Sequence, residues 1–261
     1  MQFQQLDYRL NLGVARITLN RPERRNAITT VMLAELLYAL EFCAGEPAVR
    51  VVILQGAGKG FCAGDDLAGM GVLPDGFEYR PQQPLTHAAL QSTLLTLAKP
   101  VVAVLHGFAF GVGLDLAMAC DFRIAANSVQ LRDQRVIERG MHAVTGCAWL
   151  QPRSIGRTRA MQFLMLGEPL DGQGAEDWGM VTRSVAAADL EQAVDELAGK
   201  LAAAPTKALG LMKQQIYRGQ TMSHGEFMDF AQPLIQQVRI KDREEGIAAF
   251  LEKRTPQFSG E

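Results

Sequence analysis

Cysteine is scarce in this sequence, and its few copies are widely spaced. The chain has four cysteines, at positions 43, 62, 120 and 147, and it contains no Cys-x-x-Cys pair. Disulfide frameworks and zinc sites both depend on numerous or closely spaced cysteines. We therefore predict neither a disulfide framework nor a zinc site, and we expect a reducing, cytoplasmic location.

A strong charge of one sign and long apolar runs are also absent. The formal net charge is −2, so no nucleic-acid-binding surface is indicated. No stretch reaches the roughly 18 uninterrupted apolar residues that a membrane helix needs. Residues 1–13 lack the basic start and apolar core of a secretory signal. The sequence therefore predicts a protein that is neither exported nor embedded in a membrane.

What is present is an ordinary globular composition arranged as alternating strands and helices. Residues 3–22 predict a β-hairpin, and residues 30–44 predict a helix. Apolar strands follow at 49–56 and 99–107, and the second leads into a helix at 111–120. Nearly all-apolar strands fit a sheet that is covered on both faces. This alternation predicts an α/β fold with largely parallel strand pairing.

Two further segments break this alternation. Residues 71–87 contain three prolines and two glycines without periodicity, which is typical of a mobile surface loop. From about residue 186 the strand pattern disappears, and the sequence is helical to near its end. The C-terminal third is therefore predicted to form a separate helical layer.

Two glycine-rich turns follow apolar strands, and neither matches a phosphate-binding motif. The turn at 56–61 has Phe61 where a dinucleotide fingerprint needs glycine, and Gly60 where a P-loop needs serine or threonine. The turn at 111–116 has Leu116 at the corresponding last position. A glycine turn before a helix still leaves backbone N–H groups without helical partners. Two such turns that converge can bind one carbonyl oxygen as an oxyanion hole, whereas each alone is an ordinary strand-to-helix connection.

Four segments carry the most distinctive patterns of the chain. They are LNRPERRN (19–26), FCAGDDL (61–67), HGFAFGVGLDLAMACDFRIA (106–125) and KDREEGIAAFLEKRTPQF (241–258). In this order and at these separations, they resemble the enoyl-CoA hydratase/isomerase family, also called the crotonase superfamily. The resemblance implies a crotonase-type α/β spiral of repeated β-β-α units with a C-terminal α-helical trimerisation region. We accordingly predict a spiral core over residues 1–200 and an oligomerisation region over 201–261, in a homotrimer or a hexamer of two trimers.

The same resemblance implies the chemistry of the site. Members of the family act on acyl-CoA thioesters without a metal or redox cofactor, so coenzyme A enters only as part of the substrate. They hold the thioester oxygen with two backbone N–H groups, which fall here on Asp65 and Val112. An enolate stabilised in this way can undergo proton transfer, hydration, a double-bond shift, decarboxylation or C–C cleavage.

The acids that decide between these reactions are only partly those of a hydratase. Asp115 stands where family hydratases carry their first glutamate, and the resemblance makes it the principal acid or base. The alternative is a purely structural role, in which the negative charge of Asp115 stabilises the N-terminus of a helix. The second glutamate would lie about twenty residues further on, where Arg135 stands instead. Glu138 is the first predicted replacement, with His142 and Asp133 as alternatives, so a standard two-glutamate hydration mechanism is not expected.

The resemblance also implies contacts to the CoA moiety of the substrate. They fall on Arg24, Ala63, Asp66, Leu67 and Lys253. Basic side chains suit the phosphate groups of CoA. The alternative is a basic cluster that only contacts solvent, and the sequence pattern is the same in both cases.

Three functions are compatible with these residues. The first is an enoyl-CoA hydratase-like lyase or isomerase, with Asp115 as its acid or base. The second is an isomerase, decarboxylase, hydrolase or C–C cleaving relative that lacks the second glutamate. The third is a non-catalytic protein that binds CoA esters or a partner protein.

Overall fold

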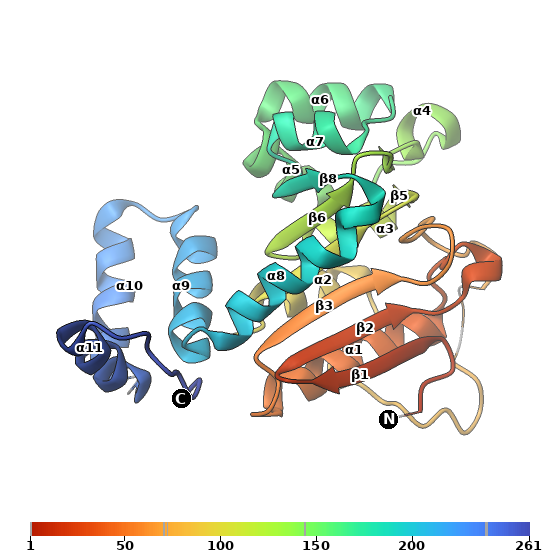
Figure 1. Ribbon diagram of the computed structural model, residues 1–261. Helices are drawn as coiled ribbons and strands as arrows, with labels where there is room; N and C mark the ends of the chain where they lie inside the picture. Colours follow the sequence, from red (N-terminus) through yellow and green to blue (C-terminus); the bar gives the residue numbers. More distant parts are fainter. Residues whose placement is uncertain (1, 70, 72, 144, 238–239) are drawn as a thin grey trace.

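The computed structural model describes every residue except 1, 70, 72, 144 and 238–239. Its centre is a six-stranded sheet in the order β1-β2-β3-β4-β6-β8 (Figure 1). The strands are β1 Leu6–Asn11, β2 Val14–Leu19, β3 Val51–Gly56, β4 Val101–Leu105, β6 Phe122–Ala126 and β8 Arg183–Val185. β1 and β2 form an antiparallel hairpin, and the other neighbouring strands pair in parallel. The predicted hairpin and the largely parallel α/β sheet are confirmed.

Helices cover both faces of this sheet. They include α1 Thr30–Gly45, α2 His87–Thr96 and α8 Leu190–Ala203. Side chains alternate between the two faces of a strand, so Val52 and Leu54 of β3 pack in one cluster with residues of α1 and α2. Val51 and Ile53 pack in another cluster with residues of α8. The nearly continuous apolar sequence of β3 is thus explained by burial on both sides.

A second, two-stranded parallel sheet lies beside the segment that follows β3. Its strands are β5 Phe108–Phe110 and β7 Gln130–Arg132. A parallel bridge between Cys62 and Ala109 joins the segment after β3 to β5. α3 Val112–Met118 begins directly after the glycine that ends this strand. The sequence does not predict β5 and β7, because three residues are too few to show a periodic pattern.

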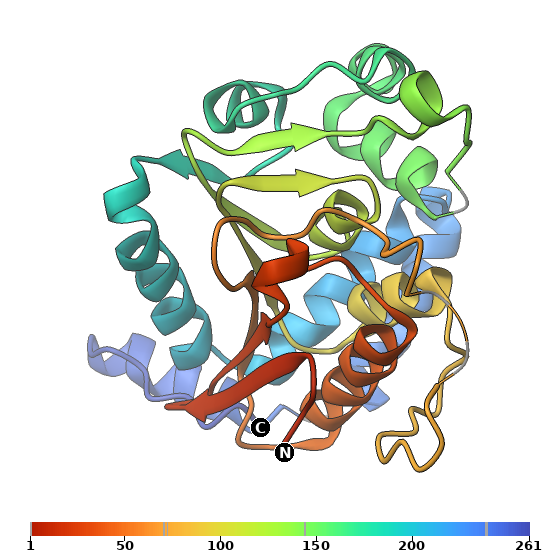
Figure 2. The same cartoon turned by 90° about the vertical axis from the view of Figure 1, so that its right-hand side faces the viewer.

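Short helices gather at one end of the sheet, at the top of Figure 1. They are α4 Arg135–Arg139, α5 Cys147–Ile155, α6 Arg157–Leu166 and α7 Gly172–Trp178. Two 3-10 turns complete the core, η1 Pro22–Arg24 and η2 Ala187–Asp189. The N-terminus of α5 and the segment before α4 approach α3 from this end, so three separate parts of the chain meet there (Figure 2).

The C-terminal helices lie to the left of the sheet in Figure 1, and Lys213 in the first of them pairs with Asp121, directly before β6, at 2.8 Å. They are α9 Thr206–Gly219, α10 His224–Gln237 and α11 Asp242–Glu252. The prediction of a helical C-terminal part beyond residue 186 is confirmed. α8 packs on the sheet and ends at Ala203, three residues past the predicted domain boundary at 200. The boundary and the role of the C-terminal helices in trimerisation remain predictions. No helix in the described part of the chain has the length and apolarity needed to cross a membrane.

The proline-rich segment before α2 is irregular, as predicted, but it is not confined to the surface. Phe77 and Tyr79 are buried and form an aromatic cluster with Phe3 and Tyr38. The Tyr79 hydroxyl also donates to the Gln2 carbonyl oxygen at 2.8 Å. The prediction of a surface loop is therefore wrong for these two aromatic side chains, whose burial fixes the segment against α1.

Candidate active site

Two glycine turns converge beside the small sheet. Gly64 has a φ of 102° and Gly111 a φ of 50°, conformations that favour glycine. The backbone N–H of Phe110 donates to the Cys62 carbonyl at 2.9 Å, which sets the two turns next to each other. A Cβ atom on Gly64 would lie 3.1 Å from the Phe110 carbonyl oxygen and 3.6 Å from the Val112 nitrogen. The missing side chain at Gly64 thus permits the close approach of the two turns.

The residues that follow these glycines carry the two predicted oxyanion donors. Asp65 follows Gly64, and Val112 is the first residue of α3 after Gly111. Within the described residues, neither of their N–H groups donates to another protein group. Two unpartnered N–H groups on adjoining turns form the arrangement that can bind a single carbonyl oxygen.

The side chains of Asp65 and Asp66 are held by different partners. His87, the first residue of α2, places its Nε2 atom 2.9 Å from Asp65 Oδ1. Arg21 donates to Asp66 Oδ2 at 3.1 Å, and this hydrogen bond lowers the pKa of Asp66. The sequence does not single out His87, because it lies 22 positions from Asp65 at the end of an irregular segment.

Asp115 is buried in the first turn of α3, with 1% of its surface exposed. Its partner is Arg135, which donates from Nη1 to Asp115 Oδ2 at 2.7 Å and from Nη2 to Oδ1 at 3.1 Å. The Thr145 hydroxyl also donates to Asp115 Oδ2. A guanidinium group therefore occupies the position twenty residues beyond Asp115, where the resemblance places a second acid.

The guanidinium group of Arg135 has five N–H donors, and all of them find acceptors in this cluster. Two go to Asp115, as described above. The Nε atom donates to Asp133 Oδ1 at 3.0 Å, and Nη2 donates to Asp133 Oδ2 at 2.5 Å. The last donor, on Nη1, reaches the Thr145 hydroxyl oxygen at 3.0 Å. Arg135 is consequently fixed by residues from three parts of the chain.

The electrostatics of this cluster follow from its burial. Burial raises the pKa of the Asp115 carboxyl group, and the hydrogen bonds from Arg135 and Thr145 offset part of that rise. For Arg135, burial favours loss of the proton, but the hydrogen bonds to Asp133 and Asp115 outweigh it and raise the pKa. Two carboxyl groups thus share one permanent cation. The charge of the cluster balances when one carboxyl group holds a proton, which suits a proton-transfer site.

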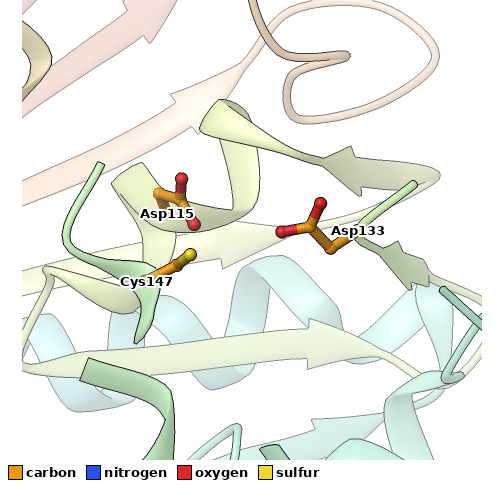
Figure 3. Close-up of side chains that lie close together, drawn as sticks. All are labelled: Asp115, Asp133 and Cys147. Carbon is orange, nitrogen blue, oxygen red and sulfur yellow. The ribbon is translucent and has the colours of Figure 1, made fainter. Parts of the chain in front are cut away.

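Cys147 completes a group that resembles a metal site in composition. One ligand atom each of Asp115, Asp133 and Cys147 lie within 4.8 Å of one another, and Figure 3 shows the three side chains converging. However, Arg135 already donates to both carboxylates. Burial and the charge of Asp115 raise the pKa of the Cys147 thiol to about 12, so it is not a thiolate. The chemistry of this group does not favour a metal ion, since the guanidinium is its cation.

Glu138 and His142, two of the predicted replacements for the second acid, make no hydrogen bond or ion pair with Asp115 among the described residues. Glu138 has 46% of its side chain exposed and pairs with Arg132 at 2.6 Å. His142 is exposed at the edge of a cavity of about 300 Å³, which Asp133 and Arg135 also line. The other walls of this cavity come mainly from apolar residues of α5 and α6. The structure therefore brings Asp133 to the cluster through Arg135, and leaves Glu138 at the surface.

The predicted CoA contacts fall into two groups. The Ala63 N–H donates to the Arg25 carbonyl at 3.0 Å, so η1, which ends at Arg24, lies next to the turn that carries Asp66. Leu67 is 69% exposed in the same region. Lys253 caps α11, and Figure 1 places that helix at the far end of the molecule from this turn. Only the first four residues are thus close together within one chain.

Replacing Arg135 with methionine is expected to lower the free energy of unfolding by about 3–5 kcal/mol, because it leaves buried carboxylates without their cation. Urea denaturation near neutral pH measures this loss. Arg9→Met is the control, since Arg9 and Asp7 form an exposed pair that contributes about 0–1 kcal/mol. Equal losses in the two variants would contradict the structural importance of the buried cluster.

Comparison with known proteins identifies the family of this chain. The sequence pattern of the enoyl-CoA hydratase/isomerase family matches residues 9–261. The chain therefore belongs to this family of enzymes, and the resemblance found in its motifs is confirmed.

Individual relatives carry both names of the family. The chain is 37% identical over 255 residues to the 1,2-epoxyphenylacetyl-CoA isomerase of Escherichia coli, covering 95% of each chain. It is 32% identical over 274 residues to a probable enoyl-CoA hydratase of Rhodobacter capsulatus, covering all of both. The crystal structure of an enoyl-CoA hydratase from Bacillus anthracis matches with a TM-score of 0.87 at 32% identity, covering 99% of this chain and 100% of the other. The predicted crotonase fold is thereby confirmed.

Proposed function

We propose that this protein is an acyl-CoA isomerase in which Asp115 alone carries the transferred proton. The observation that supports this proposal most directly is the Arg135 side chain, which occupies the second-acid position and bonds both oxygens of Asp115. The relative named 1,2-epoxyphenylacetyl-CoA isomerase is consistent with an isomerase. The substrate is an acyl-CoA thioester, and the reaction requires no further cofactor.

The thioester oxygen binds between the N–H groups of Asp65 and Val112. These groups are preorganised, because both are fixed in turns and neither has a competing protein acceptor among the described residues. Each donor of this kind stabilises the negative charge of an enolate by about 3–4 kcal/mol. The thioester thereby becomes acidic enough at a neighbouring carbon for a carboxylate to remove a proton.

Asp115 then transfers that proton between two carbons of the acyl group. Its carboxylate accepts the proton from one carbon, the electron pair of the C–H bond enters the enolate, and the carboxyl group returns the proton at another carbon. No water is consumed and no oxidant or reductant is needed. Hydration, in contrast, requires a second group to activate water, and Arg135 cannot serve because a guanidinium does not release its proton.

Paired assays with a 3-enoyl-CoA and with crotonyl-CoA in D₂O test this function. We expect the double bond of the 3-enoyl-CoA to move into conjugation with the thioester, with little hydration of crotonyl-CoA. A ring-derived acyl-CoA belongs in the same panel because of the named relative. Sustained hydration of crotonyl-CoA without a double-bond shift would refute the isomerase assignment. No turnover of any acyl-CoA in the panel would favour the non-catalytic alternative.

A further inference from the structure

Asp133 is a buried acid that the proton transfer described above does not use. It directly follows β7, and 2% of its side chain is exposed. Its carboxylate accepts from the backbone N–H of Arg135 at 3.1 Å and from the guanidinium at Nε and Nη2. All three of these contacts are made to a single residue. Asp133 thus binds the Nε edge of the Arg135 guanidinium, while the two terminal nitrogens also donate to Asp115.

We propose that Asp133 is a positioning residue for Asp115: it orients Arg135 and offsets its charge, so that the Asp115 carboxyl group can both accept and return a proton. This inference rests on the proposed function of Asp115. Among the described residues, Asp133 makes no hydrogen bond to the oxyanion donors or to Asp115, because its carboxylate bonds to Arg135.

The geometric part of this role concerns the direction of the guanidinium fork. Asp133 takes the Nε donor and one Nη2 donor, and this leaves Nη1 and the other Nη2 donor directed at Asp115. A planar group held along one edge has little freedom to turn. Arg135 therefore contacts Asp115 in one orientation, and this in turn fixes the orientation of the Asp115 carboxylate.

The electrostatic part concerns the balance of charge around Asp115. A lone buried guanidinium would hold Asp115 ionised and make it a weak base. Asp133 supplies a second negative charge, with a carboxylate oxygen within 4.8 Å of Asp115. The other titratable group in contact range is the Cys147 thiol of α5, while His142 lines the nearby cavity and His87 of α2 pairs with Asp65. Asp133 is the only one of these that contacts Arg135 directly in the described structure.

The pH dependence of turnover by Asp133→Asn tests this role. Asp115 must be ionised to accept a proton, so kcat/KM falls as the pH drops through its pKa. Asparagine removes a nearby negative charge, and this lowers the pKa of Asp115. The acid limb of the kcat/KM profile, meaning the pH range over which kcat/KM falls, is therefore expected to move to lower pH by about one unit. The maximal kcat also falls, because Asp115 becomes a weaker base.

Asp121→Asn is the matched control for a merely structural effect. Asp121 is a partly buried carboxylate that pairs with Lys213 at 2.8 Å, outside the Asp115 cluster. We expect it to lower stability without moving the limb. Should Asp133→Asn not fold, Asp133→Ser removes the same charge and leaves room for a water at Arg135. A limb that stays at the wild-type pH in the folded variant, or that moves equally in Asp121→Asn, would overturn the proposal.

An infrared titration without substrate separates this proposal from the proposed function. The band of the protonated Asp115 carboxyl group is identified by its loss in Asp115→Asn. Its midpoint is expected at lower pH in the Asp133 variant than in the wild type, whether or not any acyl-CoA is turned over. An unchanged midpoint refutes the role of Asp133, whereas a shifted midpoint in a protein without isomerase activity refutes only the proposed function.

Discussion

Asp115→Asn is expected to reduce the kcat of isomerisation by about 10²–10⁴-fold, the usual contribution of a positioned acid or base. Asparagine keeps the size of the side chain and an oxygen that can accept from Arg135, but it cannot accept the substrate proton. We expect KM to change little, because the thioester is held by backbone groups of other residues. The rates of the double-bond shift and of deuterium incorporation from D₂O measure the loss together.

Glu138→Gln is the matched control for this substitution. It also neutralises an acid near Arg135, but Glu138 is half exposed and pairs with Arg132 rather than with the buried cluster. Its activity is expected to stay within about twofold of the wild type, since surface pairs contribute little. If Glu138→Gln lost as much activity as Asp115→Asn, the assignment of the proton to Asp115 would fail.

Val112→Pro is expected to lower kcat by about 10²–10³-fold, because proline removes one of the two N–H groups that bind the thioester oxygen. The position is suited to this test. Val112 is the first residue of α3, where proline is well tolerated. The preceding residue, Gly111, has no Cβ to clash with the proline ring. The substitution therefore deletes a donor with little change in the helix.

Val112→Ala distinguishes the donor from the side chain. Alanine retains the N–H group and removes most of the apolar side chain, so it is expected to stay well above the activity of the proline variant. Circular dichroism and the urea midpoint show whether Val112→Pro keeps its fold. A folded proline variant with wild-type kcat would mean that the oxyanion lies elsewhere.

Much of the fold follows from the sequence because its signals are local. The alternation of strands and helices, and the apolar sequence of β3, both reflect burial on two faces of one sheet. Phe77 and Tyr79 show the limit of this argument. Their segment has the composition of a loop, yet their rings pack against Phe3 and Tyr38, which lie far away in the sequence. Composition predicts an irregular backbone but not which of its side chains find a buried partner.

The site was predictable where it depends on the backbone and less so where it depends on side chains. The glycine turns and Asp115 have distinctive spacings, and the structure places them together. The spacing also places Arg135 at the position expected for the second acid. Sequence alone does not show that an arginine at this position forms a buried ion pair with Asp115. Glu138, the first predicted replacement for the second acid, lies three residues beyond Arg135 in α4. On the helix it turns to the surface instead, whereas Asp133 bonds to Arg135 across the start of that helix.

The buried cluster also has a consequence for how the enzyme folds. Asp115, Arg135 and Thr145 come from segments separated by 10 to 30 residues in the sequence. Each of these groups is stable inside the protein only when the others are in place, since an isolated buried charge is strongly unfavourable. The cluster is therefore complete only when α3, β7 and the start of α5 have docked. A partly folded chain would keep Asp115 hydrated and inactive, so the capacity for proton transfer arises together with the completed fold.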